Sequence, residues 1–67
     1  MNNRIKVARA EQRMTQQQLA EAAGVSRQTI NAIESGKFVP STVLALKMAR
    51  IFSCNVDELF QLDEDEL

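Results

Sequence analysis

The sequence predicts a single all-α domain made of five short helices. The chain has 67 residues, of which 45% are hydrophobic and 25% are charged, so it has the length of one small domain, residues 1–67. Hydrophobic residues recur at helical spacing in short segments, and residues typical of helix caps precede these segments. The scarce glycine and proline residues (Gly24, Gly36 and Pro40) fall between the segments. A strand is expected only at the extreme ends, over residues 1–2 and 61–62.

The first two helices are predicted over residues 4–13 and after Thr15. In the first, Ile5, Ala8 and Val7 are expected to face inward, with Asn2 or Asn3 as the cap. In the second, Thr15 and Gln18 have the spacing of a capping box. The inward face of the second helix consists of Leu19, Ala20 and Ala23, and Gly24 ends it in a left-handed turn.

The third helix is predicted over residues 27–34, with Ser26 as its cap. Val25 lies in the corner between the second and third helices, where its apolar side chain is expected to fill the turn. Ile30 and Ile33 are the only large apolar residues of the third helix, and they share one face.

The fourth helix is predicted to begin after Ser41 and to run to about Phe52. Its apolar residues form one stripe at helical spacing: Leu44, Ala45, Met48, Ala49 and Phe52. Asn55 and Glu58 again have the spacing of a capping box, and they begin a last short helix. That helix carries Val56, Leu59 and Phe60.

The composition excludes several classes of protein. With no His and one Cys (Cys54), the chain lacks the common nucleophile–base pairs of enzymes, an internal disulfide and the usual zinc ligands. It also lacks a long apolar run or an apolar N-terminal stretch. We therefore expect a cytoplasmic protein that is not an enzyme and needs no metal, cofactor, membrane or small-molecule ligand. Cys54 is expected to be a small buried hydrophobic residue, and a redox switch is the alternative.

Charge is distributed unevenly along the chain. The net charge is -1, but all eight basic residues lie at or before position 50. Residues 1–54 hold only three acids and sum to +5, whereas the last thirteen residues hold six acids and sum to −6. A basic body with an acidic end can bind an anion, because the local field decides. The acidic C-terminal end, residues 61–67, is expected to be a solvated, frayed terminus, or else a tail that repels DNA or a wrong partner.

The second and third helices carry the functional prediction. Two short helices joined by a tight turn with a glycine are typical of a helix-turn-helix. The third helix exposes Arg27, Gln28 and Asn31 rather than the Glu and Lys of an ordinary surface helix. Arg makes paired hydrogen bonds to guanine, and Gln or Asn to adenine, in the major groove. Ala32 is small enough to allow close approach, and its methyl group suits a thymine methyl.

Residues 15–37, TQQQLAEAAGVSRQTINAIESGK, resemble the phage repressor and Cro-type (XRE-type) helix-turn-helix proteins. The similarity extends to the flanking helices, including Pro40-Ser41 and Val56-Asp57-Glu58-Leu59-Phe60, and the size resembles that of the stand-alone members. The resemblance implies a five-helix, lambda-repressor-like DNA-binding domain. It implies base contacts by the third helix, from Arg27, Gln28, Asn31 and Ala32. It also implies contacts with DNA phosphates from Gln16, Ser26, Thr29, Ser35 and Lys37.

Some of these residues have an alternative structural role. Ser26 is first of all a helix cap, and Gln16 either braces Arg27 or merely solvates its own helix. The resemblance implies a structural ion pair between Arg9 and Glu34, with phosphate binding by Arg9 as the alternative. Three further basic residues are expected to lie on a solvated face: Arg4, Lys6 and Arg13.

A homodimer is predicted because one recognition helix reads only a few base pairs, whereas a dimer reads two half-sites about one helical turn apart. Small domains also gain stability from a partner chain. The candidates for the interface are Ile51, Phe60 and Leu62, in the region through which similar short family members dimerise. The alternative for Phe60 is that it completes the core. We therefore predict a dimeric, sequence-specific regulator of transcription that binds double-stranded DNA, more in keeping with a repressor than an activator. The alternative is a protein-interaction module on the same fold, such as an antitoxin or anti-regulator.

Overall fold

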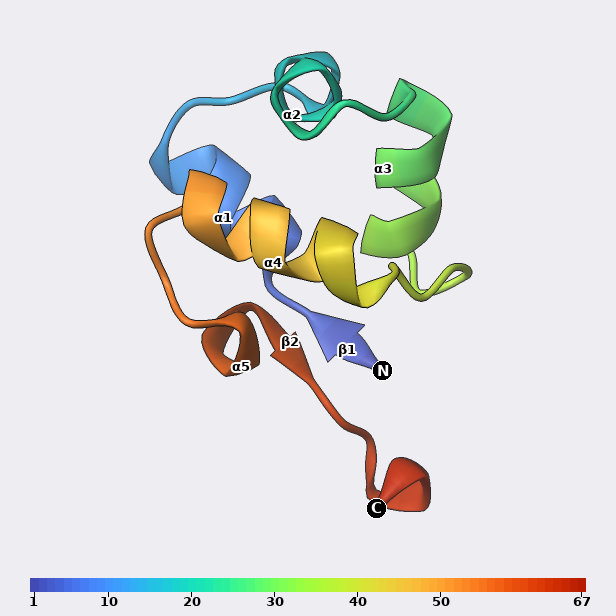
Figure 1. Ribbon diagram of the computed structural model, residues 1–67. Coiled ribbons are helices and arrows are strands. Elements are labelled where there is room, and N and C mark those ends of the chain that lie inside the picture. Colours follow the sequence, from blue (N-terminus) through green and yellow to red (C-terminus); the bar gives the residue numbers. More distant parts are fainter.

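The computed structural model describes all 67 residues and contains five α-helices in the predicted order (Figure 1). They are α1 (Ile5–Glu11), α2 (Gln16–Ala23), α3 (Arg27–Glu34), α4 (Thr42–Ile51) and α5 (Val56–Leu59). Two short strands, β1 (Asn2–Asn3) and β2 (Phe60–Gln61), and a terminal 3-10 helix (Glu64–Glu66) complete the chain. The all-α prediction is confirmed. None of the helices has the length and apolar character needed to cross a membrane.

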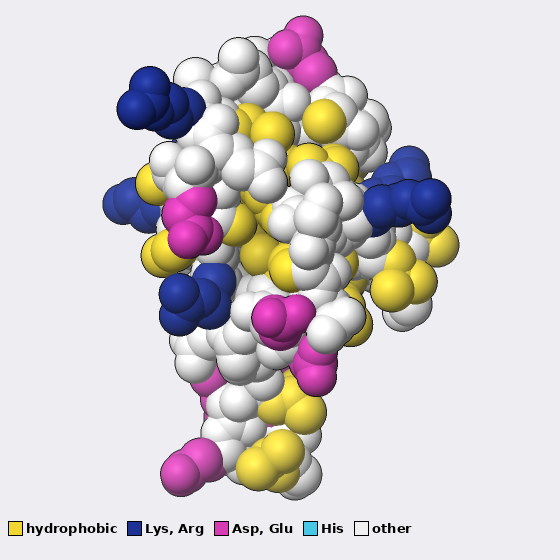
Figure 2. Space-filling model, turned by 90° about the vertical axis from the view of Figure 1, so that its left-hand side faces the viewer, with side chains coloured by type: hydrophobic (Ala, Val, Ile, Leu, Met, Phe, Trp, Pro, Cys, Tyr) yellow, Lys and Arg dark blue, Asp and Glu magenta, His cyan; other side chains and the backbone are white.

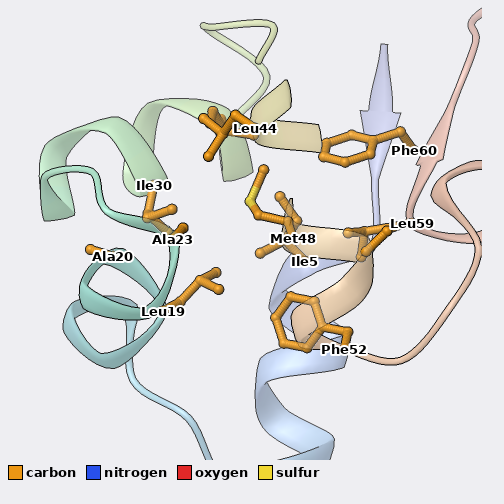
Figure 3. Close-up of a cluster of buried hydrophobic side chains, with 12 residues drawn as sticks. Ile5, Leu19, Ala20, Ala23, Ile30, Leu44, Met48, Phe52, Leu59 and Phe60 are labelled. Atoms are coloured by element: carbon orange, nitrogen blue, oxygen red, sulfur yellow. The ribbon is translucent and has the colours of Figure 1, made fainter. Parts of the chain in front are cut away.

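The core lies where α2 and α3 face α1, α4 and α5 (Figure 3). In this close-up, Leu19 and Ile30 point from α2 and α3 toward Met48 of α4, and Leu59 and Phe60 close the far side. All twelve buried side chains of this cluster are hydrophobic: Ile5, Leu19, Ala20, Ala23, Ile30, Ile33, Leu44, Met48, Ala49, Phe52, Leu59 and Phe60. The predicted inward faces of α2, α3 and α4 are therefore confirmed. Val25 packs against this cluster from the turn between α2 and α3, as predicted.

Helix α1 differs from its prediction at both ends. It begins after Arg4, and the Asn3 side chain binds the first turn by accepting a hydrogen bond from the Ile5 backbone N–H at 3.2 Å. It ends at Glu11, because Arg13 adopts a left-handed conformation with φ of 52°. The prediction that Val7 faces inward was wrong, since its side chain is 45% exposed. Ile5 alone is fully buried in this helix.

Local hydrogen bonds set the helix starts as the sequence predicts. The Gln18 backbone N–H donates to Thr15 Oγ1 at 3.0 Å, and the Thr15 N–H donates back to Gln18 Oε1 at 2.8 Å. Gly24, with φ of 75°, ends α2 in the left-handed region, where a residue without a Cβ is favoured. Ser41 Oγ accepts from the Leu44 N–H at the start of α4, and Glu58 Oε1 accepts from the Asn55 N–H at the start of α5.

The two ends of the chain are held together, which corrects the prediction of a frayed acidic terminus. Strands β1 and β2 pair antiparallel, with Asn2 opposite Gln61 and Asn3 opposite Phe60. Strand β1 begins one residue later than predicted, and β2 begins one residue earlier. The N-terminal ammonium of Met1 lies 2.8 Å from Asp63 Oδ2 and 3.0 Å from Glu66 Oε1. Part of the negative charge of the C-terminal end is therefore used to fasten it to the N-terminus.

Candidate nucleic-acid interface

Helix α3 is oriented by its two isoleucines. Ile30 and Ile33 are completely or almost completely buried against the core, so the opposite face of the helix, with Arg27, Gln28 and Asn31, is exposed. Figure 1 shows α3 on the right-hand side of the molecule, standing steeply across α2, which is seen nearly end-on. The short helix therefore projects its polar face away from the body of the protein.

The first turn of α3 is held by Ser26. Its Oγ accepts a hydrogen bond from the Thr29 backbone N–H at 3.2 Å and lies 3.0 Å from Thr29 Oγ1. The predicted cap is therefore present. Both hydroxyls are engaged with each other at the N-terminal end of the helix, where free backbone N–H groups favour an anion such as a phosphate.

Gln16 braces Asn31 rather than Arg27. Its Nε2 lies 3.3 Å from Asn31 Oδ1 and 3.3 Å from Glu34 Oε1. The expectation of a contact with Arg27 was wrong because the first residue of α2 lies beside the middle and end of α3. In this contact the Asn31 side-chain oxygen is the acceptor, so the Asn31 amide NH₂ remains free to donate.

The ion pair between Arg9 and Glu34 is present, and it joins α1 to the last turn of α3. Arg9 Nε donates to Glu34 Oε2 at 2.6 Å and Nη2 donates to Oε1 at 3.0 Å. The third nitrogen, Nη1, donates to the Met14 backbone oxygen at 2.9 Å. Because the Glu34 carboxylate accepts two of these hydrogen bonds, the pKa of Arg9 is raised above its ordinary value. With all three nitrogens engaged, Arg9 has a structural role, and it neutralises the one acid of α3.

The loop after α3 turns back onto the helix. Gly36, with φ of 80°, makes the turn, and the Lys37 backbone N–H donates to the Ala32 oxygen at 2.9 Å. Ser35 Oγ donates to the same oxygen at 3.1 Å. The Lys37 side chain is exposed beside α3. The next residue, Phe38, also lies exposed beside α3; the sequence reasoning missed it because the loop has no periodicity to interpret.

The three residues predicted for a dimer interface differ in burial. Phe60 is 8% exposed and belongs to the core, which is the alternative that the sequence left open. Ile51 is half-buried and packs against the core. Leu62, which directly follows strand β2, is 60% exposed. Of these three residues, Ile51 and Leu62 therefore offer apolar surface for an interface, and Phe60 does not.

Cys54 is half-buried and packs against the core, so it is less deeply buried than the sequence suggested. Burial raises the pKa of its thiol, and the negative charge of Glu58 adds to this effect. A raised thiol pKa disfavours the thiolate that a redox switch uses. The structure thus supports the packing role.

The acidic residues of the C-terminal end form a patch at one end of the molecule (Figure 2). Figure 2 shows the left-hand face of Figure 1, with the C-terminal segment at the bottom. On this face the lowest part carries Asp and Glu and no Lys or Arg, whereas the basic side chains lie higher on the molecule. The uneven charge along the sequence is therefore also an uneven charge in space.

Helices α2 and α3, the turn between them and the outward polar face of α3 define a helix-turn-helix domain. Comparison with known proteins agrees, because the chain matches a family described as helix-turn-helix over residues 5–59. An uncharacterized HTH-type transcriptional regulator of Archaeoglobus fulgidus is 48% identical over 100% of this chain and 94% of its own length. The HTH-type transcriptional regulator YgzD of Bacillus subtilis is 45% identical over 97% of this chain and 98% of its own length. The HTH-type transcriptional activator BcrR of Enterococcus faecalis is 36% identical over 94% of this chain, which spans 31% of that protein.

The chain belongs to the helix-turn-helix family, in its XRE type. The resemblance seen in residues 15–37 is thereby confirmed. Membership of this family makes the chain a DNA-binding protein rather than an enzyme.

Proposed function

We propose that this chain is a regulator of transcription that binds an inverted-repeat operator as a homodimer, with α3 in the major groove. The observation that carries the proposal is the exposed face of α3. It presents Arg27, Gln28 and Asn31, and its one acid, Glu34, is turned away in an ion pair with Arg9. These three side chains supply the paired hydrogen-bond donors and acceptors with which a protein, reaching into the major groove, distinguishes one base pair from another.

The surroundings of α3 supply the contacts that hold a reading helix against the DNA backbone. Gln16, Ser26, Thr29, Ser35 and Lys37 lie on α2, at the two ends of α3 and in the loop that follows. Of these only Lys37 carries a charge. A single chain would therefore neutralise few phosphates and bind weakly at physiological salt.

A homodimer would bind DNA more tightly than a single chain, because it doubles every contact. Two copies related by a two-fold axis would read half-sites about 34 Å apart, one helical turn of DNA. Exposed Leu62 and half-buried Ile51 are the apolar residues of the proposed interface, and buried Phe60 supports the strand that Leu62 follows. The chain would act as a repressor, because occupying a promoter requires no part beyond the DNA-binding domain. The alternative is activation, which is the role in the name of BcrR. A reporter gene placed behind the selected operator distinguishes the two roles, because a repressor lowers its expression and an activator raises it.

The test is selection from a random pool of double-stranded DNA at near-physiological salt. Enrichment of an inverted repeat with half-sites about one turn apart supports both base reading and the dimer. Enrichment of a single half-site would remove the dimer from the proposal. If the folded protein enriches nothing, the proposal fails, and a protein partner of the antitoxin or anti-regulator kind becomes the function to test.

Two variants show whether α3 does the reading. Arg27→Ala should weaken binding to the selected site by about 1–3 kcal/mol and relax the base preference at one position. Lys6→Ala is the matched control, because it removes one exposed positive charge from α1 and should preserve the preference. If Arg27→Ala binds the selected site as tightly as the parent while remaining folded, the assigned role of α3 is wrong.

A further inference from the structure

The outward face of α3 is bordered by a hollow. It has a volume of about 400 Å³, lies open to solvent, and is lined by Gln28, Thr29 and Ala32 of α3 and by Lys37 and Phe38 of the loop. None of the five lining residues is acidic. Gln28 and Ala32 are two of the proposed base-reading residues, so the hollow lies on the surface that DNA would cover.

Phe38 forms the apolar wall of this hollow. The other two phenylalanines of the chain, Phe52 and Phe60, are buried, whereas Phe38 is 51% exposed. Its position is fixed by the backbone, because the Phe38 N–H donates to the Ala32 oxygen at 3.2 Å, beside the bond from Lys37. The backbone of Phe38 is therefore held against α3, and its exposed side chain lines the hollow together with Ala32.

The lining residues have the chemistry of one feature of DNA. In the major groove, thymine is the only one of the four bases with an apolar group, its C5-methyl. The Ala32 methyl group and the Phe38 ring provide nonpolar surface against which that thymine methyl group can pack. At the rim, the Lys37 ammonium suits a phosphate of the backbone, and contacts to phosphate fix the register of a reading helix.

We propose that this hollow receives the C5-methyl group of a thymine in each half-site, which makes Phe38 a specificity-determining residue. The inference rests on the proposed DNA-binding function and adds to it a base preference and the residue that sets it. A second copy of the chain is a weaker occupant, because a protein contact there would block Gln28 from the DNA.

The test replaces each thymine of the selected site by deoxyuridine, which lacks only the methyl group. At one position per half-site, the parent protein should bind the deoxyuridine site about three- to fivefold more weakly, the effect of returning one methyl group to water. Phe38→Ala should bind the thymine and deoxyuridine sites about equally at that position. Val39→Ala, which shortens the neighbouring exposed side chain, should keep the parent's discrimination.

The outcomes separate this inference from the proposed function. A parent protein that selects a site but is indifferent to every deoxyuridine overturns the inference and leaves the DNA-binding function intact. So does a Phe38→Ala variant that retains the full discrimination, or a selected half-site without thymine. A parent protein that selects no site overturns both. Because the Phe38 side chain is half exposed, the variant should stay folded, which a thermal melt followed by circular dichroism checks.

Discussion

Replacing Arg9 by methionine should destabilise the fold substantially. The change leaves the Glu34 carboxylate, 8% exposed, without its donors at 2.6 and 3.0 Å and the Met14 oxygen without its donor at 2.9 Å. Only Gln16 Nε2, at 3.3 Å, would remain on Glu34. Removing one partner of a buried ion pair costs about 3–5 kcal/mol. Since the Arg9 side chain is 15% exposed, we expect the lower end, about 3 kcal/mol.

Urea unfolding followed by far-ultraviolet circular dichroism measures this loss, since the chain has no Trp or Tyr for fluorescence. For a domain of this size, a loss of about 3 kcal/mol lowers the melting temperature by roughly 12–24 °C. The double variant Arg9→Met/Glu34→Leu should be less destabilised than the sum of the single changes, because it leaves no charge unpaired. Arg4→Met removes an exposed arginine next to α1 and should change the stability by no more than about 0.5 kcal/mol.

The same experiment decides between the two roles of Arg9. If Arg9 served mainly to bind phosphate, Arg9→Met would weaken DNA binding while the free energy of unfolding stayed within about 0.5 kcal/mol of the parent. That result, or single effects that simply add in the double variant, would refute the structural argument. A loss of DNA binding that accompanies the loss of stability is expected, because Glu34 would then present an unpaired negative charge near the DNA.

Three further predictions follow from the same structure. Ile33→Ala should lower the free energy of unfolding by about 2–5 kcal/mol, because it opens a cavity beneath α3; a urea titration measures it, and a loss below about 1 kcal/mol would contradict the burial. Lys37→Ala should weaken binding about equally to all DNA sequences and reduce the salt slope by about 1, and a sequence-dependent loss would instead mark Lys37 as a base contact. At the chain ends, the Met1 ammonium donates hydrogen bonds to Asp63 and Glu66, which raises its pKa above 8.0. Glu66 accepts hydrogen bonds from the Asp63 backbone N–H and from this ammonium, which lowers its pKa below 4.5. The stabilisation from the Met1 ammonium is full below about pH 8 and is lost as the pH rises through the pKa of the ammonium in the folded protein. The stabilisation from the Glu66 carboxylate is full above about pH 4.5 and is lost as the pH falls through the pKa of the carboxylate in the folded protein. The difference in stability between the parent and Glu66→Gln should therefore be largest between these limits, and a difference independent of pH would argue against the contact.

The helix boundaries were predictable because local chemistry sets them. The bounds of α3 follow from a serine cap at one end and Ser35-Gly36 at the other, and the structure has the predicted range. The starts of α2 and α4 follow from Thr15 and Ser41 in the same way. Each of these signals acts within a few residues of itself, so a single sequence contains all the information needed.

The contacts that the sequence could not supply join distant segments. The pairing of β1 with β2 and the bonds from Met1 to Asp63 and Glu66 span almost the whole chain, and an acidic run alone gives no sign of such a partner. The partner of Gln16 was misjudged for a similar reason. Which turn of α3 it meets depends on the angle between α2 and α3, which no local pattern specifies.

The network around Glu34 shows why an acid is tolerated at the end of a helix proposed to lie against DNA. An unpaired carboxylate there would repel phosphates, yet Glu34 receives three hydrogen bonds, from Arg9 and Gln16. Through Gln16 the same network reaches the oxygen of Asn31, which fixes the Asn31 amide with its NH₂ available for donation. Glu34, which ties α3 to α1 through Arg9, thus also restrains the proposed base-reading side chain of Asn31 through Gln16. Changes at Gln16 should consequently alter base preference at the Asn31 position even though Gln16 itself is assigned to the phosphate backbone.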